Sequence, residues 1–272
     1  MQVGHAAGVC EPLQIIFDNG LVYGYAPGKT VNWGLLWDDH VARKYVGSLA
    51  KFHMTDPAKI NLFDHHGKES KIVKSDQPQL FNKLRDVIRN TQEELKNFPE
   101  RNKRMKQFWT KDRFLEEIDL LEEHFTKFNM NLTYSHNDIW VNNVVYDKDT
   151  DTLSLLDFEY CDYCYEAYDL GILFNCFQLF ESYRAVFPRN IMIPTDDEMK
   201  LPRTEEHRKK LVKFYMEEKC VYLGKDPNDY TEKEFHNFYT QTEMISMMVN
   251  LYWTLFGLSQ ADDPTVKWNI LG

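Results

Sequence analysis

The chain has 272 residues, of which 43% are hydrophobic and 14% are aromatic, and its formal net charge is -10. A chain of this length and ring content can bury a large core and also line a pocket, so we exclude global disorder. The acidic balance disfavours nucleic acid and anionic membrane surfaces as partners, because both would repel the protein.

The sequence also predicts a cytoplasmic protein without a membrane span. It contains no run of about 18 apolar residues, and its first residues lack the charged and apolar regions of a signal peptide. The cysteine count is 5, an odd number that argues against a disulfide framework. Cys161 and Cys164 form a CxxC motif, but no further ligands follow at a zinc spacing.

The first predicted elements are two strands, at residues 13–17 and 21–25. Asp18, Asn19 and Gly20 lie between them and are typical of a tight hairpin turn, which needs positive φ. The run 26–28, Ala-Pro-Gly, then interrupts the pattern and is predicted to be a linker.

Helices dominate the rest of the chain. Apolar residues at helical spacing predict a helix from Asp38 to His53, and Thr231 and Glu234 form a capping box at the start of the last helix. The polar segment 56–78 is predicted to be a long loop. The helices are expected at residues 38–53, 80–95, 114–125, 204–219 and 231–259.

Short apolar runs are embedded among these helices, at residues 132–134, 143–146 and 153–158. The acidic segment 147–151 between the last two predicts a hairpin loop. A hairpin, a linker and a mostly helical body with embedded strand pairs indicate an α+β, protein-kinase-like fold. We expect residues 1–28 to be a remnant of the N-terminal small lobe with its hinge, and residues 29–272 to be the helical C-terminal lobe.

The chemistry of this chain is expected at Asp138, Asn143 and Asp157. Asn143 lies five residues after Asp138, and Asp157 lies fourteen residues after Asn143, beyond the predicted hairpin. Phosphoryl transfer from ATP to a hydroxyl group needs a carboxylate that orients the hydroxyl and accepts its proton, and oxygen ligands for Mg²⁺. Asp138 suits the first task, and Asn143 and Asp157 suit the second.

The spacing of these residues is more specific than any one of them. A His-x-Asp, an asparagine or an Asp-x-Glu alone recurs by chance in many chains, but the three in this order across a hairpin are rare. Protein kinases use the same arrangement, with Asp-Phe-Gly after the hairpin. In this chain, Glu159 stands in place of that glycine.

The longer motifs resemble those of the choline/ethanolamine kinase family. The family's His-Asn-Asp followed by Asn corresponds to residues 136–143, and its Asp-[Phe/Tyr]-Glu-Tyr corresponds to residues 157–160. Residues 163–171, YCYEAYDLG, resemble the stretch that follows. The segments 19–23 and 251–255 are more similar to ethanolamine kinase than to choline kinase. The resemblance covers nearly the whole chain, which looks truncated at both ends.

The resemblance implies a choline kinase-like fold and an ATP- and Mg²⁺-dependent transferase that phosphorylates ethanolamine or choline for phospholipid synthesis, in particular phosphatidylethanolamine synthesis. It implies Asp138 as the catalytic base, Asn143 and Asp157 as Mg²⁺ ligands, and Asp169 as a structural brace. Adenine would be held by the backbone of Tyr23, Gly24, Tyr25 and Ala26. The amine pocket would be lined by Tyr160, Tyr165, Trp253 and Phe256.

Two alternatives stay open at this point. An aromatic cage suits an ammonium group through cation–π attraction, but Trp253 and Phe256 would equally serve as core packing on a helix face. The family's phosphate loop and phosphate-binding lysine have no counterpart in the chain, which favours a catalytically impaired member that acts as a binding or regulatory partner. The expected partners are a small amino alcohol and, in addition, a second copy of the chain or a paralogue.

Overall fold

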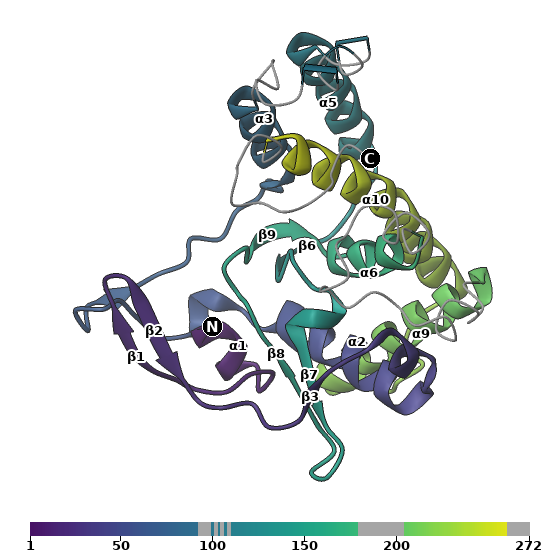
Figure 1. Ribbon diagram of the computed structural model, residues 1–272. Helices are drawn as coiled ribbons and strands as arrows, with labels where there is room; N and C mark the ends of the chain where they lie inside the picture. Colours follow the sequence, from purple (N-terminus) through teal and green to yellow (C-terminus); the bar gives the residue numbers. More distant parts are fainter. Residues whose placement is uncertain (92–98, 101–102, 104–105, 108–109, 179–203, 260–272) are drawn as a thin grey trace.

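The computed structural model describes residues 1–91, 99–100, 103, 106–107, 110–178 and 204–259. The β1–β2 hairpin projects at one side of the molecule, and the long helices lie away from it (Figure 1). The helices are α1 Gln2–Ala6, α2 Asp39–Met54, α3 Leu80–Asn90, α5 Lys111–Thr126, α6 Tyr168–Gln178, α9 Glu205–Tyr222 and α10 Glu232–Ser259, with 3-10 turns at Trp33–Trp37, Pro57–Lys59 and Val141–Asn143. The strands are β1 Leu13–Phe17, β2 Gly20–Tyr23, β3 Lys29–Thr30, β4 Leu62–Phe63, β5 Glu69–Ser70, β6 Leu132–Ser135, β7 Val144–Asp147, β8 Thr152–Leu155 and β9 Asp162–Tyr165.

The N-terminal hairpin forms as the sequence predicts. Phe17 pairs with Gly20 across a two-residue turn, so the second strand begins one residue earlier than expected and ends at Tyr23. The pairing shifts between Leu13 and Ile15, which places a bulge in β1. The hairpin leaves apolar side chains in solvent: Ile15 is 50% exposed and Phe17 is 52% exposed.

Two small antiparallel sheets organise the middle of the chain. In the first, β7 lies between β3 and β8, and the 147–151 segment closes the predicted hairpin between β7 and β8. In the second, β6 pairs with β9, with Ser135 opposite Asp162. This pairing brings the residues that follow β6 next to the residues that precede β9, although they are far apart in sequence.

The large helices enclose one hydrophobic core. Helix α2 packs against α9, and α10 packs against α6. Helix α2 begins after Asp38, whose carboxylate accepts hydrogen bonds from the backbone N–H groups of His40 and Val41. The predicted capping box of α10 is also present, because Thr231 and Glu234 bond each other's backbone N–H groups.

The structure differs from the sequence prediction in the segment 56–78. Rather than a continuous loop, it contains the 3-10 turn Pro57–Lys59 and the short β4–β5 hairpin. The turn of that hairpin is held by the Asp64 carboxylate, which accepts hydrogen bonds from the N–H groups of His66 and Lys68. Helix α3 ends at Asn90, and positions 92–95 of the predicted helix lie outside the described residues.

The architecture is α+β, as predicted. No helix among the described residues is both long enough and apolar enough to cross a membrane. Val3 and Val9 belong to the same core as the large helices, and the backbone oxygen of Val9 accepts a hydrogen bond from Leu155 at 2.7 Å. The division of the chain at residue 28 stays a prediction.

Candidate active site

The site is built on the loop 136–143, which follows strand β6. Asn137 has a φ of 65°, in the left-handed region that asparagine adopts more readily than most residues. Its side-chain amide donates to the backbone oxygens of Tyr160 at 3.0 Å and Asp162 at 3.3 Å. These bonds tie the loop to the segment that carries Asp157.

Asp169, in the first turn of α6, accepts hydrogen bonds from the backbone of this loop. Its Oδ2 accepts a hydrogen bond from the backbone N–H of His136, and its Oδ1 accepts one from that of Asn137, both at 2.8 Å. His53 Nε2 lies 2.8 Å from Oδ2, and both side chains are 0% exposed. Burial alone would raise the pKa of Asp169, but the bond from His53 and the nearby charges lower it, so the carboxylate stays ionised. These contacts connect Asp169 to the loop backbone, and its role as a brace stays a prediction.

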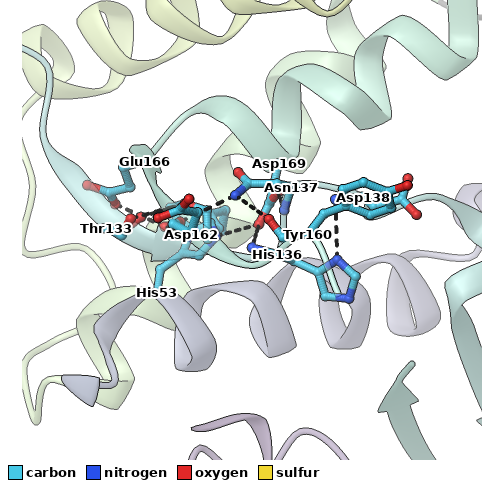
Figure 2. A network of polar contacts seen from close by, with 11 residues as sticks. His53, Thr133, His136, Asn137, Asp138, Tyr160, Asp162, Glu166 and Asp169 are labelled. Atoms are coloured by element: carbon cyan, nitrogen blue, oxygen red, sulfur yellow. Dashed lines mark hydrogen bonds and ion pairs between the residues drawn. The ribbon is translucent and has the colours of Figure 1, made fainter. Parts of the chain in front are cut away.

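The support continues into α2 and α9. Figure 2 shows His53 reaching from α2 toward Asp169, and its other ring nitrogen lies 2.7 Å from the Tyr215 hydroxyl. Tyr215 in turn donates to Glu166 Oε1 at 3.0 Å, and Lys219 Nζ lies 2.5 Å from the same oxygen. A continuous chain of polar contacts therefore runs from Lys219, in the last turn of α9, to the backbone of the loop 136–143.

His136 connects the loop to the segment before Asp157. Its Nε2 donates to the backbone oxygen of Leu156 at 2.8 Å, and the N–H of Leu156 donates to the backbone oxygen of Asn143 at 2.8 Å. Burial lowers the pKa of His136, so the ring is neutral and acts as a structural donor. Asp157 follows directly, is exposed, and has a φ of 59°.

Asp138 and Asn143 are in direct contact. The Asn143 amide donates to Asp138 Oδ2 at 2.9 Å and to the Asp138 backbone oxygen at 2.8 Å. Burial raises the pKa of Asp138 to about 7, and the charge of Asp157 adds to this, while the bond from Asn143 opposes it. A carboxylate with such a pKa can exchange a proton near neutral pH, as a general base requires.

The donor set of Asn143 and Asp157 fits a hard cation. With its amide nitrogen bound to Asp138, Asn143 offers its carbonyl oxygen, and Asp157 offers an exposed carboxylate. Oxygen ligands of this kind, leaving room for water and phosphate oxygens, are what Mg²⁺ prefers.

A small pocket that is partly open to solvent lies beside the loop. Asn137 belongs to its wall, and at its rim Lys83 Nζ lies 3.0 Å from Asp162 Oδ2. The lining residues are Gln79, Leu80, Lys83, Asn137, Tyr160, Tyr163, Cys164, Tyr168 and Tyr252. Four tyrosines therefore line a space next to Asn137, which precedes the candidate base in sequence.

The aromatic residues predicted to line the amine pocket lie in different surroundings. Of the predicted pocket aromatics, Tyr160 lines the pocket, whereas Tyr165 is only 4% exposed and packs against Phe81 and Phe125 in the core. Trp253 and Phe256 are next to the pocket residue Tyr252, with ring centroids 5.4 Å and 6.4 Å from it. Trp253 and Phe256 therefore pack against a residue of the pocket wall but do not line the pocket themselves.

The predicted adenine-binding segment, 23–26, runs from the end of β2 toward β3. Tyr25 is 83% exposed, and the backbone N–H of Gly24 donates to the oxygen of Pro12 at 3.0 Å. Its role toward adenine stays a prediction.

Sequence reasoning missed several residues of the site. Tyr163, Tyr168 and Tyr252 stand within or beside the aromatic motifs, so the motifs already carried a signal for them. Lys83 and Gln79 belong to the start of α3, whose sequence carries no such signal. Their place in the wall follows from how α3 packs, for example through the bond from Gln79 N–H to the oxygen of Tyr163.

Comparison with known proteins gives the family. A family model described as choline/ethanolamine kinase matches residues 5–271, so the chain belongs to the choline/ethanolamine kinase family. An ethanolamine kinase of Drosophila melanogaster is 26% identical over 269 residues, which are 98% of this chain and 46% of the relative. The chain thus spans about half the length of this relative.

Solved structures share the fold. The ethanolamine kinase of Plasmodium vivax superimposes with a TM-score of 0.67 at 16% identity, over 97% of this chain and 65% of the other. The choline kinase LicA of Streptococcus pneumoniae, solved in complex with AMP, gives a TM-score of 0.58 at 11% identity, over 96% of this chain and 69% of the other. The predicted choline kinase-like fold is confirmed.

Proposed function

We propose that this protein transfers a phosphoryl group from ATP to the hydroxyl group of a small amino alcohol, ethanolamine or choline, in phospholipid synthesis. The observation that carries the proposal is the position of Asp138. Its carboxylate accepts a hydrogen bond from Asn143, senses the charge of Asp157 and has its pKa raised to about 7 by burial. The residue before it, Asn137, lines the tyrosine-rich pocket. Membership of the family supports the same reaction.

In this proposal, Asp138 orients the substrate hydroxyl and accepts its proton as the phosphoryl group is transferred. Asn143 keeps the Asp138 carboxylate in place through its amide and, together with Asp157, would hold Mg²⁺. When bound, Mg²⁺ would neutralise the charge that develops on the phosphates. The backbone of residues 23–26 would hold adenine, with residues 1–28 forming the small lobe and its hinge.

The pocket suits the amine end of the substrate. Tyr160 and Tyr252 come from different segments and present rings with which an ammonium group interacts favourably. Burial raises the pKa of Tyr252 to about 12, so it stays neutral and cannot form an ion pair with the amine. Recognition would then rest on cation–π attraction and shape, with Trp253 and Phe256 supporting the ring of Tyr252.

The test is a coupled assay of the purified chain with ATP, Mg²⁺ and ethanolamine or choline. Asp138→Asn should lower turnover by about 10²–10⁴-fold, because the amide cannot accept the proton. Asp157→Ala should remove the Mg²⁺-dependent part of nucleotide binding. Asp149→Asn, in an exposed turn, is the matched control and should leave both unchanged. Turnover of Asp138→Asn within a few-fold of the parent would contradict the assigned role.

A second candidate is a catalytically impaired family member that binds a partner. It is favoured by the apolar surface of the β1–β2 hairpin, where Phe17, Leu21 and Ile15 are all about half exposed. If the parent chain binds nucleotide but shows no turnover on either amine, while its hairpin variants lose association with a second copy or a paralogue, this candidate replaces the first.

A further inference from the structure

Two hairpins that lie far from the loop 136–143 in sequence meet through Asp18, His65 and His66. Asp18 begins the two-residue turn of the β1–β2 hairpin, and the histidines occupy the turn between β4 and β5. In Figure 1 the far end of the β1–β2 hairpin lies beside the blue segment that contains residues 62–70. The carboxylate of one turn and the two imidazoles of the other therefore lie close together on the surface.

The three side chains are close to the geometry of a metal site. The Asp18 Oδ1 atom lies 2.9 Å from His65 Nε2, and one ligand atom from each residue lies within 4.8 Å of the other two. Two ligands on one tetrahedral ion, each bound at about 2.0–2.2 Å, are separated by about 3.4 Å. The three side chains are exposed, and rotations about their side-chain bonds would bring the ligand atoms toward that separation.

The turn that carries the histidines is already ordered. The Asp64 carboxylate accepts hydrogen bonds at 2.9 Å from the N–H groups of both His66 and Lys68, and Gly67 has a φ of 70°, in the left-handed region that the turn requires. The hairpin is also fixed to helix α1, because the Gln2 side chain donates to the Phe63 oxygen at 2.7 Å and accepts from its N–H at 2.9 Å. A preorganised turn lowers the entropy lost when a ligand binds.

We propose that Asp18, His65 and His66 bind a divalent transition ion of the Zn²⁺ class, with water completing its coordination. Two imidazole nitrogens and one carboxylate oxygen favour Zn²⁺, Co²⁺ or Ni²⁺ over Mg²⁺, which selects oxygen ligands. The site therefore differs in chemistry from the Asn143 and Asp157 pair. The bound ion would link the β1–β2 hairpin to the β4–β5 hairpin. The apolar side chains of the β1–β2 hairpin are exposed.

The experiment is a titration of untagged protein with Co²⁺, followed by its visible absorption spectrum. We expect one bound ion with nitrogen and oxygen ligands, displaced by Zn²⁺ and unaffected by excess Mg²⁺. His65→Asn and His66→Asn should each weaken binding by about tenfold or more, because one of three protein ligands is lost. His236→Asn, at an exposed position on α10, is the matched control and should bind as the parent does.

Three further measurements separate this site from other metal-binding groups. Asp157→Ala should keep the cobalt spectrum, and the spectrum should lack a thiolate charge-transfer band, which would indicate the cysteines instead. Zn²⁺ should slow hydrogen exchange in both hairpins of the parent but not in His66→Asn. Circular dichroism establishes that the variants are folded. Co²⁺ binding that is equally tight in His66→Asn, or no stoichiometric binding by the parent, would overturn the proposal.

Discussion

Two aspartates at the loop 136–143 have different surroundings: Asp138 belongs to the loop, and Asp169 of α6 binds its backbone. Asp169 is fully buried, and backbone N–H groups and His53 supply hydrogen bonds to both of its oxygens, so its pKa is lowered. Asp138 is partly buried beside the carboxylate of Asp157, and its pKa is raised to about 7. Burial by itself raises the pKa of both carboxyls, and the donors around each one decide the outcome.

The two carboxylates differ in whether their surroundings stabilise the charged form. The surroundings of Asp169 stabilise its charge and hold the loop in place. The surroundings of Asp138 leave its charge under-stabilised, which costs folding free energy but keeps a carboxylate able to exchange a proton near neutral pH. Substitutions at and around these two aspartates should separate the two effects.

Asp169→Ala should lower the free energy of unfolding by about 3–5 kcal/mol, because His53 and two backbone N–H groups would lose their buried acceptor. The folded-state pKa of Asp169 is lowered, so its stabilisation is present above the ordinary value of 3.8 and fades as pH falls through the folded-state pKa. Urea unfolding at pH 7 and at low pH measures both. Asp149→Ala is the exposed control, and an equal loss there would contradict the brace.

Asp138→Asn should stabilise the protein at pH 8 by about 1–3 kcal/mol, although it removes the candidate base. The pKa of Asp138 rises from 3.8 to about 7 on folding, so the parent loses stability as pH increases between these values. The gain of the variant should therefore vanish near pH 4. A variant no more stable than its parent at pH 8 would show that the Asp138 charge is not under-stabilised.

Lys219→Met should lower the free energy of unfolding by about 1–2 kcal/mol, since it leaves the Glu166 carboxylate, 3% exposed, without its cation. The effect is smaller than that at Asp169 because Lys219 is 26% exposed and Tyr215 still donates to Glu166. Lys213→Met on the same helix, where the contact with Glu217 is 3.8 Å long, is the matched control in urea unfolding and should cost less.

Phe17→Ser should change the free energy of unfolding by no more than about 0.5 kcal/mol, because the ring is 52% exposed. It should also reduce self-association measured by light scattering. Phe81→Ala, at a ring that is 0% exposed, should cost about 3–5 kcal/mol and serves as the comparison. A large loss for Phe17→Ser would mean that the hairpin is covered in solution.

The sequence by itself determined the features that depend on neighbours along the chain. The turn at Asp18, the helix start near Asp38 and the capping box at Thr231 each need only a few adjacent residues, so their patterns indicated the elements correctly. The order and spacing of Asp138, Asn143 and Asp157 pointed to the family for the same reason, because one loop and one hairpin carry all three.

Only the tertiary structure decided how these residues are surrounded. His53 reaches Asp169 across 116 positions and Tyr215 across 162 positions, and no local pattern marks such a contact. The pocket likewise joins Lys83 of α3 to Tyr252 of α10, while Tyr165 turns into the core instead. The raised pKa of Asp138 is of the same kind, because burial results from the packing of segments that are distant in sequence.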